Sequence, residues 1–412
     1  MTATRPSPLS RFAAAAPPPP VMEARRWIAR AVFPPERPLI NLSQAAPVDP
    51  PPEALRRAMG EMLADPACHL YGPVLGMPEL RAEIAARWSA AYGGEVAARD
   101  VAITAGCNMA FCAAMATIAA AGDAVMLPVP WYFNHRMWLD LMGIETIPLP
   151  CGPDMTPDPE AARARMGGRV KAIVLVTPNN PTGAEYPAGL VAEFAGIARR
   201  GGAALVLDET YRDFDGREGA PHGLFADPDW RDTLVHLYSF SKAFRLTGHR
   251  VGALVADPAR LAQAEKFIDT VAICAPQLGQ RAALWGLRNL GDWVAGERAE
   301  ILRRREAARA VFDGLPGWEV LGSGAYFAYV RHPFAEPSDT LARRLVAEQS
   351  LLMLPGTMFG PVLAEGGDGR PERELRVAFA NAGAEGIAET GRRLAAATAA
   401  AGVGAHAREL PK

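Results

Sequence analysis

The chain has 412 residues, of which 50% are hydrophobic and 21% are charged, so it is a globular protein too long for one ordinary core. Its formal net charge of −2 gives no electrostatic reason to expect nucleic acid or an anionic membrane as a partner. The cysteines form no CxxC pair and no His/Cys spacing typical of a metal site, so we expect free thiols, a cytoplasmic protein and no metal.

The N-terminal 20 residues are rich in alanine and proline and end in a run of four prolines. Charged residues and prolines interrupt them, so they contain no apolar stretch of signal-peptide length. We predict a disordered or extended arm over residues 1–20, followed by a segment over residues 21–50 that packs on a small C-terminal domain. The apolar stretch Met109–Ala121 is too short to cross a bilayer, so we expect no membrane span.

Between residues 51 and 290, short apolar runs alternate with helical patterns such as Ala188–Arg200. This alternation predicts βαβ units and a large α/β domain with a three-layer, mostly parallel sheet. In such sheets the functional residues gather at the carboxyl ends of the strands. The predicted strands are Val101–Thr104, Ala124–Leu127, Ala172–Thr177, Ala204–Leu207 and Thr233–Tyr238.

Residues 291–412 have a different character and predict a smaller α+β domain. A long charged helix over Trp293–Asp313 precedes a strand over Gly322–Val330. A second strand, Leu375–Ala380, is followed by an alanine-rich helix, and we expect residues 395–412 to be frayed toward the end of the chain.

Lys242 directly follows a predicted buried strand, in the string Ser239-Phe240-Ser241-Lys242. A lysine amine forms an imine with an aldehyde, and burial lowers its pKa toward a useful range. Ser239, together with Arg250 between two glycines, is suited to hold a phosphate. Taken alone, the string is also compatible with an ordinary surface lysine.

Two further strand ends carry polar groups that suit a heteroaromatic ring. Asp208 can pair with a pyridinium nitrogen, although it can equally be a helix N-cap, and Tyr211 can reach the same place. Asn180, in the string TPNNPTG, presents an amide to a ring oxygen, although an Asn-Pro dipeptide is also typical of a turn.

Gly106, Cys107 and Asn108 lie between a predicted strand and a helix, where free backbone N–H groups can bind phosphate. Cys107 is expected to contribute its main-chain N–H or its size rather than a nucleophilic thiol. Tyr132, in the string PWYFNH, offers an aromatic face for stacking, whereas we assign Trp131 and Phe133 to the core.

These strings occur in a consistent order, and together they are highly specific. From about Ile40 to Phe379 the chain resembles the class I/II aminotransferases of fold type I, which use pyridoxal 5′-phosphate. The matching strings are YGPVLGMPELR, AGCNMA, PWYFNH, NNPTG, DETY, SFSK, GHRVG and RVAF.

The resemblance implies a role for each matching residue. Lys242 would hold the cofactor as a Schiff base and move the proton, Asp208 would pair with the pyridine nitrogen, and Asn180 and Tyr211 would hold the ring hydroxyl. Tyr132 would stack on the ring, and Arg376 would bind the substrate α-carboxylate. The phosphate would be surrounded by Gly106, Cys107, Asn108, Ser239 and Arg250. Tyr71 would reach the phosphate of a neighbouring subunit, which implies a homodimer.

The string NLSQAAP over residues 41–47 departs from the pattern. It resembles NLGQGFP of kynurenine and glutamine transaminases, but Ser43 and Ala45 replace the two glycines and Ala46 replaces the phenylalanine. Ala45 would lie at the substrate, with Asn180 and Arg376, so its added side-chain atom is expected to shrink or shift the pocket.

The predicted activity is transfer of an amino group from an L-amino acid to a 2-oxo acid. Residues 266–280, where related proteins often place an arginine for a second carboxylate, contain none, which favours neutral, bulky or aromatic substrates. Two alternatives remain open. One is a different pyridoxal-phosphate reaction on the same scaffold, namely β- or γ-elimination, substitution or oxidation. The other is a non-catalytic regulator with the same fold.

Overall fold

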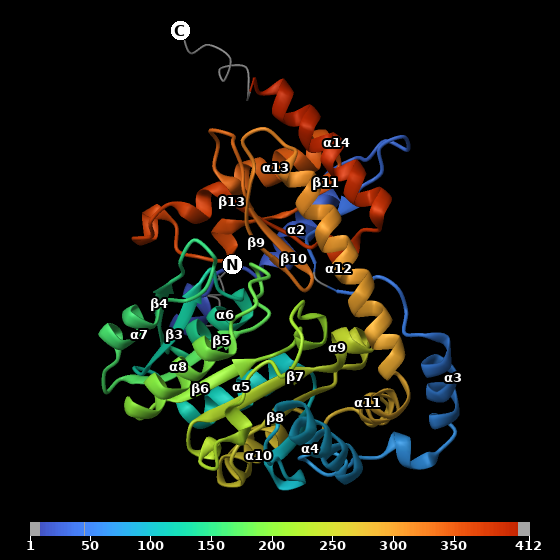
Figure 1. The fold of residues 1–412 in the computed structure, drawn as a ribbon, viewed down its shortest axis with the longest axis vertical. Helices are drawn as coiled ribbons and strands as arrows, with labels where there is room; N and C mark the ends of the chain where they lie inside the picture. Colours follow the sequence, from blue (N-terminus) through green and yellow to red (C-terminus); the bar gives the residue numbers. More distant parts are fainter. Residues whose placement is uncertain (1–8, 45, 403–412) are drawn as a thin grey trace, which may run out of the picture.

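The computed structural model describes residues 9–44 and 46–402. Its larger part is built on a seven-stranded sheet (Figure 1) with the order β2-β8-β7-β6-β5-β3-β4. Only β8 among these strands runs antiparallel to its neighbours. The strands are β2 (Val101–Thr104), β3 (Ala124–Val129), β4 (Glu145–Pro150), β5 (Val170–Val176), β6 (Ala204–Asp208), β7 (Leu234–Ser239) and β8 (Gly252–Val255). The predicted α/β class and mostly parallel sheet are confirmed.

Helices cover both faces of this sheet and give it three layers. One face packs on α5 (Cys107–Ile118), α6 (Phe133–Met142) and α10 (Pro258–Ala272). The other face packs on α4 (Pro78–Tyr92), α8 (Ala188–Arg200) and α11 (Gln277–Asn289). Alternate residues of each central strand enter the two cores, because successive side chains of a strand point to opposite faces. Two further helices are α3 (Glu53–Met62), which packs on α11, and α7 (Pro159–Arg165), which packs on α8.

The smaller part contains a four-stranded antiparallel sheet with the order β12-β13-β10-β9. Its strands are β9 (Glu319–Gly324), β10 (Phe327–Arg331), β12 (Leu354–Pro355) and β13 (Glu374–Val377). The single strand predicted over Gly322–Val330 is therefore a tight hairpin. Helix α12 (Gly291–Asp313) runs from the larger part along the smaller one (Figure 1), beside α14 (Ala384–Ala400), and α13 (Ser338–Gln349) packs on β11 (Leu351–Leu352) and β12.

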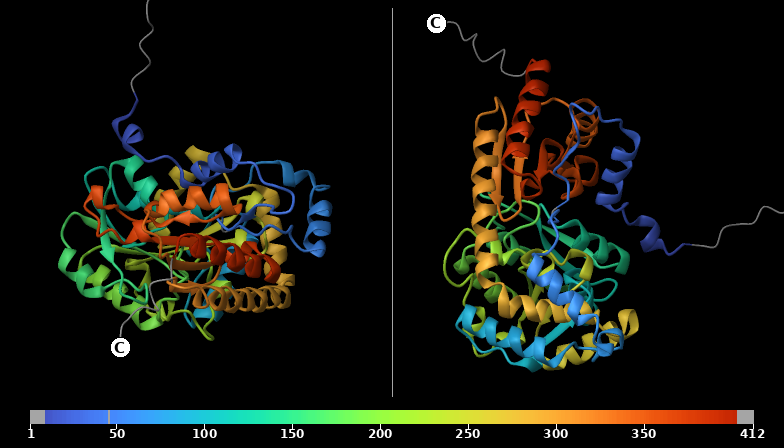
Figure 2. Two further views of the ribbon diagram at one scale, coloured as in Figure 1. Left: turned by 90° about the horizontal axis from the view of Figure 1, so that it is seen from above. Right: turned by 90° about the vertical axis from the view of Figure 1, so that its right-hand side faces the viewer.

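The N-terminal segment lies against the smaller part, because β1 (Ile40–Asn41) pairs in parallel with β11. Helix α2 (Pro20–Arg30) buries Trp27 there, and the Arg343 guanidinium lies 5.3 Å from the Trp27 ring centre. The right view in Figure 2 shows α2 beside the smaller part, with α1 (Arg11–Ala15) further along the same side. The domain boundaries at residues 50 and 290 stay predictions.

The predicted arm over residues 1–20 is not extended along its whole length. Within it, α1 is helical and packs on α6, and the Phe12 ring lies where a β-carbon on Gly143 would stand 2.3 Å from it. Glycine at position 143 therefore makes room for Phe12. Residues 1–8 of the predicted arm and residues 403–412 of the predicted frayed end lie outside the described residues, while residues 395–400 belong to α14. None of the helices described is long and apolar enough to cross a membrane.

Candidate active site

A cavity of about 370 Å³ lies at the carboxyl ends of β5, β6 and β7. Side chains from these strand ends meet others from the starts of α2 and α5, from the N-terminal segment and from β13. The predicted residues that line it are Cys107, Asn108, Tyr132, Asn180, Asp208, Tyr211, Ser239, Lys242, Arg250 and Arg376. Residues that are far apart in the sequence therefore share one cavity, as the rule for strand ends predicts.

Lys242 lies on the short helix α9 (Phe240–Ala243), which begins immediately after β7. The Ser239 hydroxyl caps this helix by accepting the Ser241 backbone N–H at 3.3 Å. The Lys242 Nζ atom lies 5.9 Å from the centre of the Tyr211 ring. Burial, assisted by the positive charges of Arg250 and Arg376, lowers the pKa of Lys242 to about 8. A useful fraction of this amine is therefore neutral and nucleophilic near neutral pH.

Asp208 is the last residue of β6, and its side chain is buried. Burial alone would raise its pKa, but the His135 ring 3.4 Å from Oδ2 and the Thr210 backbone N–H 2.9 Å from Oδ1 hold that pKa below the ordinary value. The bond from Thr210 is of the kind an N-cap accepts, yet only a three-residue turn, η3 (Arg212–Phe214), follows. Asp208 therefore remains a carboxylate that faces the cavity, where it can pair with a cationic ring nitrogen.

His135 is a site residue that the sequence analysis did not identify. Its ring lies buried on α6 and stacks on Phe111, with 3.9 Å between ring centres. The requirement that a buried carboxylate have a hydrogen-bond donor could have indicated that such a residue exists. The sequence does not show which histidine supplies it, because the contact depends on how α6 packs against β6.

The start of α5 forms the end of the cavity suited to an anion. Gly106 is the N-cap of this helix with φ +85°, and a β-carbon there would lie 2.3 Å from Arg250 Nη2. Glycine therefore allows the guanidinium to lie over the N-terminus of the helix, where unpaired N–H groups and the helix dipole favour negative charge. The buried Cys107 thiol lies 3.6 Å from Asp208 Oδ1, and burial, with this carboxylate, raises its pKa well above the ordinary value. It is not an activated nucleophile.

Tyr132 lines the cavity beside the start of α5, and its hydroxyl lies 3.4 Å from Asn108 Oδ1. Burial raises the pKa of this hydroxyl to about 12, so it stays protonated. Phe133, which we had assigned to the core, also lines the cavity, whereas Trp131 does not. Tyr132 and Phe133 therefore supply aromatic surface at this side of the cavity.

Arg376 on β13 lines the cavity and is buried, with its guanidinium 5.0 and 4.9 Å from the centres of the Phe327 and Phe359 rings. Its Nη1 donates to Asn180 Oδ1 at 2.8 Å, and its Nη2 donates to the carbonyl oxygen of Ser43. Burial lowers its pKa to about 10, so the guanidinium is still a cation at neutral pH. It is a rigid fork of the kind that binds carboxylates.

The string NLSQAAP does not narrow the cavity through Ser43. The Ser43 hydroxyl turns to Asn41 Oδ1 at 2.6 Å, while Gln44 and Ala46 line the cavity. Ala45 lies outside the described residues. Pro19 and Val21, from the region we had expected to be an arm and a packing segment, also line the cavity. No pattern in the sequence indicated this, since both follow a run of alanine and proline.

Tyr71 does not line the cavity of its own chain, and its side chain is 79% exposed.

The residues that line the cavity fit pyridoxal phosphate: a seat for its phosphate, a carboxylate for its ring nitrogen, an aromatic face and an amine for its aldehyde. This set of residues matches the phosphate, the ring nitrogen, the ring face and the aldehyde of the cofactor.

Comparison with known proteins identifies the family of the chain. The sequence pattern of the Aminotransferase class I and II family matches residues 37–394. The aromatic aminotransferase ISS1 of Arabidopsis thaliana is 28% identical over 83% of this chain and 88% of its own. The valine–pyruvate aminotransferase of Mycobacterium tuberculosis is 30% identical over 86% of this chain and 90% of its own.

Among solved structures, the aspartate aminotransferase of Thermus thermophilus with maleate superimposes with a TM-score of 0.84 at 25% identity, covering 94% of this chain and 99% of that one. The chain belongs to the class I and II aminotransferases of fold type I and is a pyridoxal-phosphate-dependent transaminase.

Proposed function

We propose that this transaminase moves the amino group of a neutral, bulky or aromatic L-amino acid to a 2-oxo acid, with Lys242 as the proton-transferring base. The observation that carries the proposal is that Lys242, Asp208 and Arg376 face one cavity. Arg376 would bind the α-carboxylate, and Lys242 would act at the α-carbon between Arg376 and the anion seat at α5.

The cofactor, when bound, supplies an electron sink for the bond that breaks at the α-carbon. Asp208, as a buried carboxylate, would keep the ring nitrogen protonated, and Tyr211 and Asn180 would hold the ring hydroxyl. Lys242 would take the α-proton and deliver it to the cofactor carbon. A base with a pKa of about 8 is well matched to this work near neutral pH.

The proposed substrate class rests on the side chains that line the substrate end of the cavity. Arg250 belongs to the anion seat beside Gly106, so Arg376 is the guanidinium left for substrate among the described lining residues. Pro19, Val21 and Phe133 add apolar surface, against which a second carboxylate would be poorly solvated. The names of the relatives include aromatic, valine and aspartate aminotransferases, so family membership alone does not select a substrate.

We further propose a homodimer in which Tyr71 serves the phosphate of the neighbouring subunit. Tyr71 and Leu70 are exposed, as are Val271 and Ile273. The Gly72 backbone N–H donates to Cys274 Sγ at 3.4 Å, which brings these two pairs of apolar side chains together on one surface. An exposed apolar surface of this kind is typical of a subunit interface. The expected cytoplasmic location stays a prediction.

Borohydride reduction is expected to attach pyridoxal phosphate to Lys242. Because the pKa of Lys242 is lowered to about 8, its neutral fraction, and hence the rate of reconstitution of cofactor-free protein, should rise through pH 8 and then level off. Stopped-flow absorbance at a series of pH values gives the pH midpoint of the reconstitution rate. Peptide mapping after reduction identifies the labelled residue.

Lys171 and Lys266 are matched controls, since both are exposed or half-exposed and lie outside the cavity. Label on either of them, or a reconstitution rate that keeps rising toward pH 10, would contradict the role of Lys242. Lys242→Ala should abolish turnover and still bind the cofactor reversibly through the anion seat at α5.

Asp208→Ala is expected to lower kcat by about 10²-fold or more, the size typical of losing one preorganised charge beside a reacting group. KM should change much less, because Asp208 does not contact the substrate carboxylate in this proposal. Steady-state kinetics on the variant measures both. Near-normal kcat would return Asp208 to the role of a turn-capping residue.

Neutral and aromatic amino acids are expected to transfer their amino group to the cofactor faster than aspartate or glutamate do. Stopped-flow loss of the visible absorbance of the bound cofactor measures each rate, and identification of the 2-oxo acid product confirms transfer. A clear preference for aspartate or glutamate over phenylalanine and methionine would show that a second cation reaches the substrate from elsewhere.

Mixing Lys242→Ala with Tyr71→Ala protein is expected to restore activity. If Tyr71 serves the neighbouring subunit, each hybrid dimer has one site with both residues, and random exchange returns about a quarter of the wild-type activity per chain. If Tyr71 served its own subunit, no hybrid site would be complete and mixing would restore nothing. Activity assays before and after subunit exchange distinguish the two results.

A further inference from the structure

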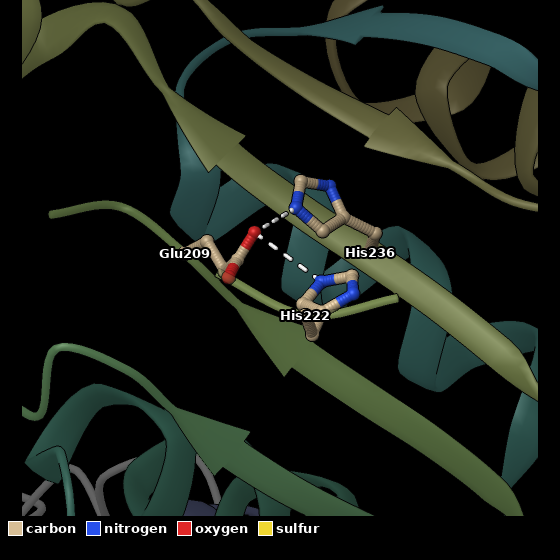
Figure 3. A group of neighbouring side chains, drawn as sticks. All are labelled: Glu209, His222 and His236. Atoms are coloured by element: carbon tan, nitrogen blue, oxygen red, sulfur yellow. Dashed lines mark hydrogen bonds and ion pairs between the residues drawn. The ribbon is translucent and has the colours of Figure 1, made fainter. Parts of the chain in front are cut away.

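A second cluster of titratable side chains lies outside the cavity. Glu209, His222 and His236 are all buried, and their ligand-type atoms lie within 4.8 Å of one another (Figure 3). Glu209 Oε2 is 2.8 Å from His236 Nε2 and 3.6 Å from His222 Nε2. Two histidines and a carboxylate at these distances are also the composition of many metal sites.

The hydrogen bonds on the far sides of the two rings indicate a different role. The Leu224 backbone N–H donates to His222 Nδ1 at 3.1 Å, and the Trp88 indole N–H donates to His236 Nδ1 at 3.4 Å. Both partners can only donate, so each Nδ1 is an acceptor, and each neutral ring carries its proton on Nε2. A histidine that binds a metal through Nε2 has the opposite arrangement, with a bare Nε2 and a donating Nδ1–H.

The two Nε2–H groups therefore point at Glu209 and stabilise its charge. Burial opposes ionisation of Glu209, but the two histidines hold its pKa well below the ordinary value. Burial lowers the pKa of His236, which keeps that ring neutral. The Tyr92 hydroxyl also donates to Glu209 Oε2. The cluster is thus a carboxylate that accepts hydrogen bonds from the Tyr92 hydroxyl and the His236 ring, with the His222 ring 3.6 Å from the same oxygen.

Glu209 is the first residue of the turn over residues 209–212, which directly follows Asp208 and contains Tyr211. Along β6, Ala204 and Val206 enter the core on the α5 side, and Leu205 and Leu207 enter the core on the α4 side. The same alternation turns Asp208 to the cavity and Glu209 toward α4. The Arg212 backbone N–H then donates to the Glu209 carbonyl oxygen at 3.2 Å and closes a turn whose middle residues, Thr210 and Tyr211, line the cavity.

The Tyr92 hydroxyl contacts the side chains of both the first and the last residue of this turn, Glu209 and Arg212. Tyr92 on α4 donates to Glu209 Oε2 and accepts from Arg212 Nη1 at 2.9 Å. The Arg212 guanidinium lies 3.5 Å from the centre of the Trp88 ring on the same helix, which fixes its plane. Glu209 and Arg212 are thus held to α4, while Asp208 and Tyr211 face the cavity.

We propose that Tyr92 and Glu209, with His222 and His236, are positioning residues that hold the turn and so place Asp208 and Tyr211 against the cofactor. The inference rests on the proposed roles of Asp208 and Tyr211. It assigns to this buried cluster a function in catalysis, although none of its side chains reaches the cavity.

Tyr92→Phe tests the proposal, because it removes only the bridging hydroxyl. We expect kcat to fall about tenfold or more with KM within about threefold of the wild-type value, the pattern of a misplaced group that acts in the chemical step. The dissociation constant of the cofactor, measured by titrating cofactor-free protein, should rise. The pH midpoint of the bound cofactor's visible absorbance should move by about 0.5 or more, because the carboxylate beside the ring nitrogen has shifted.

Tyr238→Phe is the matched control. Tyr238 is equally buried in the same region, and its hydroxyl donates to Asp213 Oδ2 at 2.6 Å, just beyond the turn. We expect this variant to lose thermal stability to a similar extent, while its kcat, cofactor affinity and absorbance midpoint stay near the wild-type values. If Tyr92→Phe matches this control in all three, the cluster is merely structural and the proposal is wrong.

Two further results keep the test decisive. His222→Asn removes the ring that lies 3.6 Å from Glu209 Oε2. It should produce the same changes to a smaller degree, which covers the case in which Tyr92→Phe does not fold. Elemental analysis of the purified holoenzyme should find no stoichiometric metal, and a tightly bound metal whose chelation lowers activity would overturn the proposal. If Asp208→Ala retains activity, the proposed function is wrong, and with it the positioning role that rests on it. If Asp208→Ala loses activity but Tyr92→Phe retains it, only the positioning role is wrong.

Discussion

A carboxylate that must stay charged although it is buried is the constraint on which this active site depends. Asp208 can attract a cationic ring nitrogen only while it is ionised, and burial alone favours its neutral form. Its charge therefore requires hydrogen bonds in a fixed geometry, which His135 on α6 and the backbone of Thr210 provide. The position of α6 and the shape of the turn after β6 are thus part of the electrostatics of the site.

Because successive side chains of a β-strand point to opposite faces, the side chains that face the cavity alternate with side chains that pack against α4. At the end of β6, Asp208 faces the cavity and Glu209 faces α4, and on β7 Ser239 faces the cavity while His236 and Tyr238 face α4. Each strand therefore delivers a functional side chain on one face and anchors itself on the other. Polar groups at both places are buried, so a shift of a strand end would break hydrogen bonds that buried groups cannot replace with water.

The sequence predicts the features that depend on local pattern. The strands β2, β3, β5, β6 and β7 were located to within two residues, because continuous apolar runs bounded by turn residues are typical of buried strands. β4 and β8 were missed. Glu145–Pro150 contains two prolines and is partly exposed, and the four-residue β8 begins with a glycine. The β9–β10 hairpin was predicted as one strand because its turn contains Ala325 at φ +44° rather than a glycine.

Most residues predicted for the site reach one cavity, since their strings lie at the ends of strands that the sequence locates well. His135, Tyr92, Pro19 and Val21 could not be assigned in this way. Each acts through a contact with a residue distant in the sequence, and its own neighbours in the chain carry no signal of that contact. Helix α1 was missed for the same reason, because its packing depends on the space that Gly143 leaves for Phe12.

Arg376 differs from Asp208 in a way that bears on substrate binding. The guanidinium is held by Asn180 from the larger part and by Ser43 from the N-terminal segment, so three regions of the chain meet at one side chain. Both partners are neutral oxygens, and among the described residues the Arg376 Nε atom has no hydrogen-bond partner. A buried cation with neutral partners retains an unbalanced charge, which the lowered pKa of about 10 reflects. The α-carboxylate of an amino acid would balance that charge.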